Sequence, residues 1–160
     1  MLDGVRLVRE PQGSAHAAIV AKIDQVLTAA LGGRWHLRLH SPLALGEHSE
    51  PEPDVAVVAG APFDYVTGHP TTAALVVEVA DSSLRLDRRF KAAVYAQAGL
   101  REYWIVNLVE RALEVYHEPQ LPADVQEGWI YRSVEVLRPP ASVTPVAAPA
   151  ARIPVADLLP

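Results

Sequence analysis

The sequence predicts an α/β sandwich in which a mixed β-sheet is flanked by helices. Valine-rich runs of strand length recur at 53–58, 74–80 and 102–108, and residues 14–33 and 87–99 carry apolar side chains at helical spacing. The second helical stretch lies between two of the apolar runs, which predicts one right-handed crossover between parallel strands. With 160 residues, the chain suits a single domain built on one core.

The first predicted helix lies within residues 14–33, after a short alternating piece at 5–8. Its apolar positions recur every three or four residues and comprise Ala15, Ile19, Ile23, Val26, Leu27, Ala30 and Leu31. Ser14 is expected to cap the start of this helix, and Gly32 is expected to end it.

Three strands are predicted next. In residues 35–40 tryptophan and leucine alternate with histidine and arginine, which is typical of a half-buried strand. Residues 53–58 and 74–80 are continuous apolar runs, and the second is the better candidate for a central strand covered on both faces.

The helix at 87–99 is predicted to bury an apolar stripe and to end at Gly99. The stripe comprises Leu86, Phe90, Ala93, Val94 and Ala98. A strand at 102–108 follows, and its Tyr103 and Trp104 are assigned to the core because they lie in an interior strand.

The last third of the chain predicts additions to a core at about 14–108. Residues 112–138 form a predicted C-terminal β-hairpin with its loop around 121–128. The Ala/Pro-rich tail, 139–160, lacks periodicity and is expected to lie along the surface, with a short turn at 155–159.

Composition narrows the functional classes. The net charge is −5, so no overall field draws the chain to nucleic acid, and a polyanion would have to meet a local patch or a metal. The absence of cysteine excludes disulfides and zinc–thiolate sites. No apolar run reaches the roughly 20 residues of a membrane span, and the N-terminus has no apolar signal core. We therefore expect a cytoplasmic protein without membrane contacts.

One carboxylate stands inside the most apolar predicted strand. Glu78 interrupts the run LVVEVA, and burial of an unpaired carboxylate is costly enough that it requires a proton, a cationic partner or a metal. Asp54 begins the neighbouring run, directly after a proline. If the two strands are adjacent, the carboxylates converge, and their oxygens favour Mg²⁺ or Mn²⁺ over zinc.

Residues Asp87, Lys91 and Tyr95 are spaced four apart and therefore lie along one side of the second helix. A lysine beside two carboxylates and a metal can orient or deprotonate an attacking water, and it can stabilise charge on a phosphate. The stretch RLDRRFK forms a local basic patch, and its arginines are candidate nucleic-acid contacts: Arg85, Arg88 and Arg89.

Each of these residues also has an ordinary structural interpretation. Glu78 can pair with an arginine or reach solvent at a strand end, and Asp54 can cap a turn. Lys91 can pair with Asp87 on an exposed helix surface, and the basic stretch can be a solvated helix start. His16 can be a half-buried histidine of the first helix.

Several stretches together resemble the Uma2-type family, formerly a domain of unknown function, of the PD-(D/E)XK superfamily of restriction-endonuclease-like proteins. They are PDVAVV, LVVEVADSS, YAQAGLREYWIVN and LEVYH. The resemblance covers nearly the whole chain, and AGLREYWIVN is its most specific part. It implies a restriction-endonuclease-like sandwich and a DNA endonuclease that depends on Mg²⁺ or Mn²⁺.

The resemblance also implies roles for individual residues. Asp54 and Glu78 match the acidic metal ligands, and the backbone carbonyl of Val79 is the implied third ligand. The superfamily lysine that normally follows the glutamate by two residues is replaced here by Ala80. Lys91 is implied to take its place.

Asp87, Tyr95 and His16 match supporting positions of the family. Family members usually carry a YELIDG-like stretch whose glutamate can join the acidic cluster, whereas this chain starts at MLDG and lacks it. Two functions therefore stay open: a DNA endonuclease, or a catalytically inactive scaffold that binds nucleic acid or a protein partner. Cleavage of both strands would use two sites, which predicts a homodimer, with the strand pair near Val115 and Tyr131 as its surface.

Overall fold

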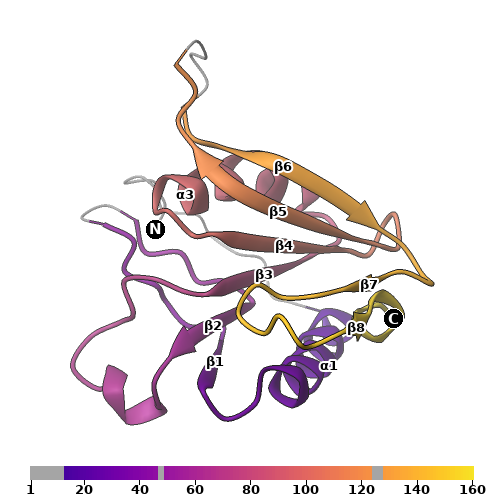
Figure 1. Cartoon of the computed structure of the whole chain (residues 1–160), viewed down its shortest axis with the longest axis horizontal. Coiled ribbons are helices and arrows are strands. Elements are labelled where there is room, and N and C mark those ends of the chain that lie inside the picture. Colours follow the sequence, from indigo (N-terminus) through magenta and orange to yellow (C-terminus); the bar gives the residue numbers. More distant parts are fainter. Residues whose placement is uncertain (1–12, 47–48, 124–127) are drawn as a thin grey trace.

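The computed structural model describes residues 13–46, 49–123 and 128–160, so the predicted piece at 5–8 lies outside the described residues. A six-stranded sheet runs through the molecule with its strands in chain order (Figure 1). They are β1 (Trp35–Leu39), β2 (Val55–Ala59), β3 (Leu75–Ala80), β4 (Glu102–Asn107), β5 (Ala112–Gln120) and β6 (Ile130–Leu137). Only the β3–β4 pairing is parallel among them, so the predicted mixed sheet is confirmed, with β3 near its centre.

Helix α1 (Ser14–Leu31) buries one side, formed by Ile19, Val20, Ile23, Leu27 and Leu31. It ends as predicted at Gly32, whose φ of 68° lies in the left-handed region that glycine tolerates. The predicted cap at Ser14 is wrong: Gly13 is the N-cap and no side chain caps the helix. Among the described residues no helix combines the length and apolar character that a membrane crossing needs.

The crossover between β3 and β4 is one continuous helical segment with a wider middle turn. It consists of α2 (Leu84–Leu86), the π-helical turn η2 (Asp87–Lys91) and α3 (Ala92–Gln97). The predicted apolar stripe is wrong in its first half, because Leu86 and Phe90 are each 36% exposed whereas Asp87 and Lys91 are buried. The sheet beneath carries Glu78, so the helix turns its charged side inward and leaves these two apolar side chains outside.

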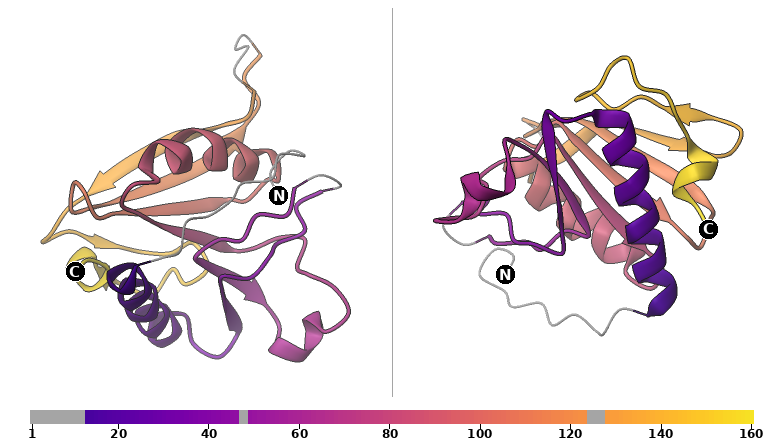
Figure 2. Two further views of the ribbon diagram at one scale, coloured as in Figure 1. Left: turned by 180° about the vertical axis from the view of Figure 1, so that it is seen from behind. Right: turned by 90° about the horizontal axis from the view of Figure 1, so that it is seen from below.

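The sheet has two faces of different character, seen edge-on in Figure 2. We call the first the apolar face; it packs Val57, Val77 and Trp104 against α1. The second, the polar face, carries Glu78 between apolar neighbours such as Val76 and Ala80, and the crossover helix covers it. Tyr103 and Trp104 are fully buried, which confirms their assignment to the core.

The Ala/Pro-rich tail belongs to the apolar side, beside α1 (Figure 1). It contains the short strands β7 (Ser142–Val143) and β8 (Ile153–Pro154) and the predicted final turn, η3 (Val155–Leu158). The expectation of a surface segment is wrong, because most of its large apolar side chains are buried, among them Val143, Ile153, Val155, Leu158 and Leu159. Lys22 of α1 donates from Nζ to the backbone oxygen of Leu159 at 2.6 Å, which anchors the end of the chain.

The predicted C-terminal hairpin is confirmed by the antiparallel pairing of β5 with β6. Strand β6 is an edge of the sheet and β1 is the other. Val115 and Tyr131, which were named for the predicted dimer surface, are themselves buried; the exposed valines of this strand pair are Val134 and Val136 of β6. Neighbouring side chains of a strand point to opposite faces, which the sequence pattern alone did not resolve here.

Candidate active site

Asp54 and Glu78 lie opposite each other on neighbouring strands. Val55 of β2 pairs with Val77 of β3 in antiparallel register. Asp54, which precedes Val55, therefore faces Glu78, which follows Val77. Each of the two carboxylates is 1% exposed. Asp54 Oδ2 accepts the backbone N–H of Val79 at 2.8 Å, which fixes this carboxylate against β3.

Lys91 lies between Glu78 and Asp87. Its Nζ is 3.0 Å from Glu78 Oε2 and 2.7 Å from Asp87 Oδ1, and all three side chains are buried. The π-helical turn η2 begins at Asp87 and ends at Lys91, and such wider turns occur frequently at functional sites. The predicted alignment of Asp87 and Lys91 on one side is therefore observed, on the buried side of the helix.

Two tyrosines and a serine hold this group in place. Tyr95 donates from its hydroxyl to Glu78 Oε1 at 2.7 Å, and Ser83 donates to Asp87 Oδ2 at 2.5 Å. Tyr103 donates to the backbone oxygen of Asp87 at 3.2 Å. The orientation of each carboxylate is thus set by groups from the crossover helix and β4.

The charge of Lys91 is stabilised by its neighbours. Burial lowers the pKa of Lys91, but the nearby carboxylates of Glu78 and Asp87 raise it further than burial lowers it, so the pKa lies above its usual value of 10.5. At neutral pH the side chain is therefore an ammonium ion that donates hydrogen bonds.

Two histidines face Asp54 from the other side. His16 Nε2 at the start of α1 lies 3.3 Å from Asp54 Oδ1, and His40 Nδ1 lies 3.5 Å from the same oxygen. His40 directly follows β1, with a φ of 45°, and its N–H donates to the backbone oxygen of Asp54 at 3.2 Å. The contact of His40 with Asp54 was not predicted; the alternation of His40 with His36 and Arg38, on a strand next to β2, was the signal that could have indicated it.

The three candidate arginines differ in their surroundings. Arg88 donates from Nε and Nη2 to Glu114 at 2.7–3.2 Å and from Nη2 to Glu110 at 2.8 Å. Burial alone would raise the pKa of Glu114, but hydrogen bonds from Arg88, Asn107 and Tyr116 lower it below its usual value. Arg85 and Arg89 are exposed on the same helical segment. The Arg88–Glu114 network was not predicted, because the sequence gives no sign that β5 lies beside the helix start.

The donor set suits a hard divalent cation. Within the ranges that the structure describes, no three or more His, Asp or Glu side chains form a ready-made metal cluster. The register of β2 and β3 nevertheless places Asp54 opposite Glu78 on adjacent strands, and carboxylate oxygens suit Mg²⁺ and Mn²⁺. The residues present therefore fit such an ion, with water completing its coordination.

The fold is that of a restriction-endonuclease-like α/β protein. The solved structure titled as a putative nuclease belonging to DUF820, from Anabaena variabilis ATCC 29413, superposes with a TM-score of 0.67 at 18% sequence identity, covering 94% of this chain and 82% of that one. Residues 1–160 match the model of the Uma2 family, described as "putative restriction endonuclease", so the chain belongs to the Uma2 family. A search of curated proteins gave no match.

Proposed function

We propose that this protein is a metal-dependent endonuclease that hydrolyses phosphodiester bonds of DNA. The observation that carries the proposal is the buried pair Asp54 and Glu78 on adjacent strands, with the Lys91 ammonium 3.0 Å from Glu78. The nuclease-like fold and the family support the same reaction class. A carboxylate pair that can hold a metal ion, together with a nearby cation, provides the groups that metal-dependent phosphodiester hydrolysis uses.

Asp54, Glu78 and the backbone carbonyl of Val79 would hold Mg²⁺ or Mn²⁺. When bound, such an ion polarises the phosphodiester and lowers the pKa of its water. The protein contributes the fixed orientation of the carboxylates: Val79 N–H holds Asp54, and the Tyr95 hydroxyl holds Glu78. Because these contacts exist before substrate arrives, little reorganisation is needed at the moment of reaction.

We assign Lys91 the role of contacting the phosphate rather than that of deprotonating the attacking water. Its raised pKa keeps the amine protonated at neutral pH, and an ammonium has no lone pair with which to accept a proton. It can stabilise charge that develops on the phosphate and can donate a proton to the leaving oxygen. Asp87 and Tyr95 are positioning residues, because they contact Lys91 and Glu78 respectively; His16 positions Asp54.

DNA is expected to approach over the exposed arginines of the crossover helix, Arg85 and Arg89, whereas the guanidinium of Arg88 is engaged by Glu114.

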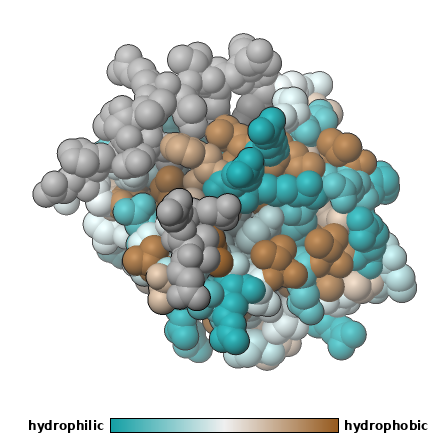
Figure 3. Space-filling model, turned by 90° about the horizontal axis from the view of Figure 1, so that it is seen from above, coloured by the Kyte–Doolittle hydropathy of each residue, from teal (hydrophilic) through white to brown (hydrophobic). Residues whose placement is uncertain are grey.

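A homodimer would supply the second site for cutting both strands. On the face shown in Figure 3, hydrophobic residues are interspersed with hydrophilic ones. We propose that edge strand β6, with its exposed Val134 and Val136, is the dimer surface. Light scattering tests this: we expect wild type to be a dimer and Val134→Lys to be a monomer.

Cleavage of supercoiled plasmid tests the proposed reaction. Wild type is compared with Glu78→Gln, Lys91→Met and the control Arg152→Gln, which removes an exposed charge of the C-terminal tail, in magnesium, manganese and chelator. We expect metal-dependent nicking that falls about 100-fold or more in Glu78→Gln and Lys91→Met and is unchanged in the control. Equal cleavage by all four proteins would contradict the proposal.

The inactive scaffold is a second candidate, favoured by one observation: the Lys91 ammonium, 3.0 Å from Glu78 Oε2, compensates the charge of that carboxylate. Thermal unfolding separates the two. A metal that binds only the folded state stabilises it by about 2.7 kcal/mol at one hundred times Kd. The nuclease predicts that magnesium or manganese raises Tm in the wild type and not in Glu78→Gln, whereas the scaffold predicts no rise in either.

A further inference from the structure

The edge strand β1 carries a row of basic side chains that leads away from the candidate active site. Arg38 and His36 pair with Ala56 and Val58 of β2, two residues of the polar face, so both point to the side on which Glu78 lies. His40 comes next on the same side and contacts Asp54. At the usual strand rise, Arg38 is about 7 Å from His40 along the chain.

Arg38 has a charge that the described residues leave uncompensated. Its Nη2 bonds to His69 Nδ1 at 3.2 Å, and its guanidinium carbon lies 5.5 Å from the ring centre of Tyr65. Its Nε is buried and has no hydrogen-bond partner within the described part of the chain. The carboxylate of Asp64 is used locally, since it accepts the N–H of Ala61 at 2.8 Å. That buried donor is costly. The uncompensated charge of the guanidinium can meet an anionic ligand at Nη2, whose contact with His69 is exposed.

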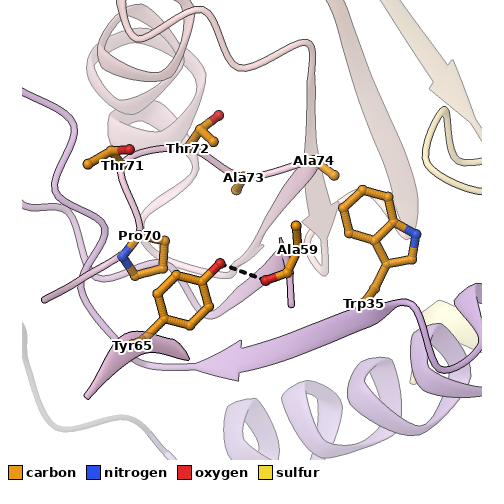
Figure 4. Close-up of a pocket in the computed structure, with 8 residues that line it drawn as sticks. All are labelled: Trp35, Ala59, Tyr65, Pro70, Thr71, Thr72, Ala73 and Ala74. Atoms are coloured by element: carbon orange, nitrogen blue, oxygen red, sulfur yellow. Dashed lines mark hydrogen bonds between the residues drawn. The ribbon is translucent and has the colours of Figure 1, made fainter. Parts of the chain in front are cut away.

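A pocket of about 350 Å³ adjoins Tyr65 at the end of β1 and β2 that is remote from Asp54. Figure 4 shows the rings of Trp35 and Tyr65 on either side of Ala59, with Thr71 and Thr72 on the segment opposite. Tyr65 belongs to the short helix η1 (Pro62–Tyr65), and its hydroxyl donates to the backbone oxygen of Ala59 at 2.6 Å, which fixes the ring. The pocket therefore lies where the two faces meet at the end of the sheet: Tyr65 packs with the polar face and Trp35 with the apolar face, and the exposed Thr71 and Thr72 complete the lining.

We propose that Arg38 and this pocket bind the DNA strand beside the cleavage position: Arg38 contacts a phosphate, and the pocket takes one unpaired base at Trp35 and Tyr65. The inference rests on the proposed nuclease function and names its substrate class, which is DNA with an unpaired base near the cut, such as an overhang or a single strand. A paired base cannot enter, because both of its faces are stacked inside the duplex. Aromatic rings beside a cationic groove are the usual means of binding single strands.

The test measures binding alone, by fluorescence anisotropy in chelator, where no cutting occurs. The probes are one dye-labelled duplex with a short single-stranded overhang, the same duplex with an abasic overhang, and a blunt duplex. We expect wild type to bind the intact overhang at least about fivefold more tightly than either of the others. This comparison uses unaltered protein, so it does not depend on the folding of any variant.

Variants then assign the effect to residues. Tyr65→Leu should bind the intact and abasic overhangs equally, whereas Phe63→Leu, in the same turn but 87% exposed and outside the pocket, should behave as wild type. Arg38→Gln should weaken binding of all three probes and reduce the salt dependence by about one phosphate contact. Arg152→Gln, which removes an exposed arginine of the C-terminal tail outside the pocket, is its charge-matched control.

The two proposals fail in different ways. Equal wild-type affinity for the intact and abasic overhangs, or equal losses in Tyr65→Leu and Phe63→Leu, overturns the base-binding pocket whether or not plasmid is cut. Base-dependent binding without metal-dependent cleavage would support the pocket and remove the nuclease.

Discussion

The two faces of the sheet are built from different chemistry although they share the same strands. On the apolar face, α1 and the C-terminal tail pack aliphatic side chains on Val57, Val77 and Trp104. On the polar face, the crossover helix buries Asp87 and Lys91 over Glu78. Apolar burial stabilises a fold directly, whereas buried ion pairs contribute little net stability and are sensitive to loss of one partner.

The difference between the two faces indicates which buried residues serve function. A core could be completed by aliphatic residues on both faces, often at no loss of stability. The buried charges of the polar face are therefore better explained by chemistry than by folding, and their failure should show as a large loss when one partner is removed.

The largest expected effect comes from the two lysines of the chain, one on each side of the sheet. Lys91→Met leaves Glu78 and Asp87 buried without their cation, so we expect a loss of about 3–5 kcal/mol in the free energy of unfolding. Lys22→Met removes a short hydrogen bond to Leu159 and a long one, 3.5 Å, to Ala156 from a half-buried side chain, and should cost about 1 kcal/mol. Urea denaturation at neutral pH measures both.

A second substitution shows whether uncompensated charge causes the loss in free energy of unfolding. Adding Glu78→Gln to Lys91→Met removes one uncompensated carboxylate and should recover part of the lost stability. Equal losses in the two lysine variants would mean that the polar face behaves as an ordinary surface.

On the apolar face, Leu27→Ala should cost about 3 kcal/mol, because Leu27 is fully buried in the cluster beneath α1 and the substitution leaves a cavity. The variant keeps every contact of the polar face, so its DNA binding and cleavage per folded molecule should equal those of wild type. A loss of activity at a temperature where the variant is fully folded would show that the two faces are not independent.

The sequence allowed the fold to be predicted wherever local residue patterns determine the secondary structure. Valine runs and the spacing of α1 predicted strands and helix, and the predicted neighbourhood of Asp54 and Glu78 follows from the observed pairing of β2 with β3. The stripe through Leu86 and Phe90 was wrong because hydrophobicity ordinarily marks the buried side of a helix, and here buried charge on the sheet reverses that preference.

The remaining features depend on contacts between distant segments. His40 reaches Asp54 only because β1 pairs with β2, and Glu114 meets Arg88 only because β5 lies beside the crossover. The tail was assigned to the surface because it has no periodicity, yet Val143 and Ile153 are buried through an isolated two-stranded pairing. A sequence read locally contains no signal for such pairings.

The smallest expected effect concerns Glu102, a buried carboxylate at the start of β4. It accepts the indole N–H of Trp104 at 2.9 Å and the backbone N–H of Val146 in the tail at 2.8 Å. Burial raises the pKa of Glu102 above its usual 4.5, against the opposing effect of these hydrogen bonds and of His117. The folded protein thus holds this proton to higher pH than the unfolded chain does, so stability falls as pH rises from 4.5 through the folded pKa.

In Glu102→Gln the side chain cannot ionise, so the variant should lack this decrease of stability with rising pH. The amide accepts one N–H and cannot accept both, which lowers the stability of the variant at every pH. The informative quantity is therefore the difference in free energy of unfolding between wild type and variant, measured by urea denaturation from acidic to neutral pH. This difference should shrink as pH rises, because only wild type must place an ionised carboxylate in the apolar face. A difference that stays constant would mean that Glu102 ionises as easily inside the protein as outside, and that the tail exposes it to water.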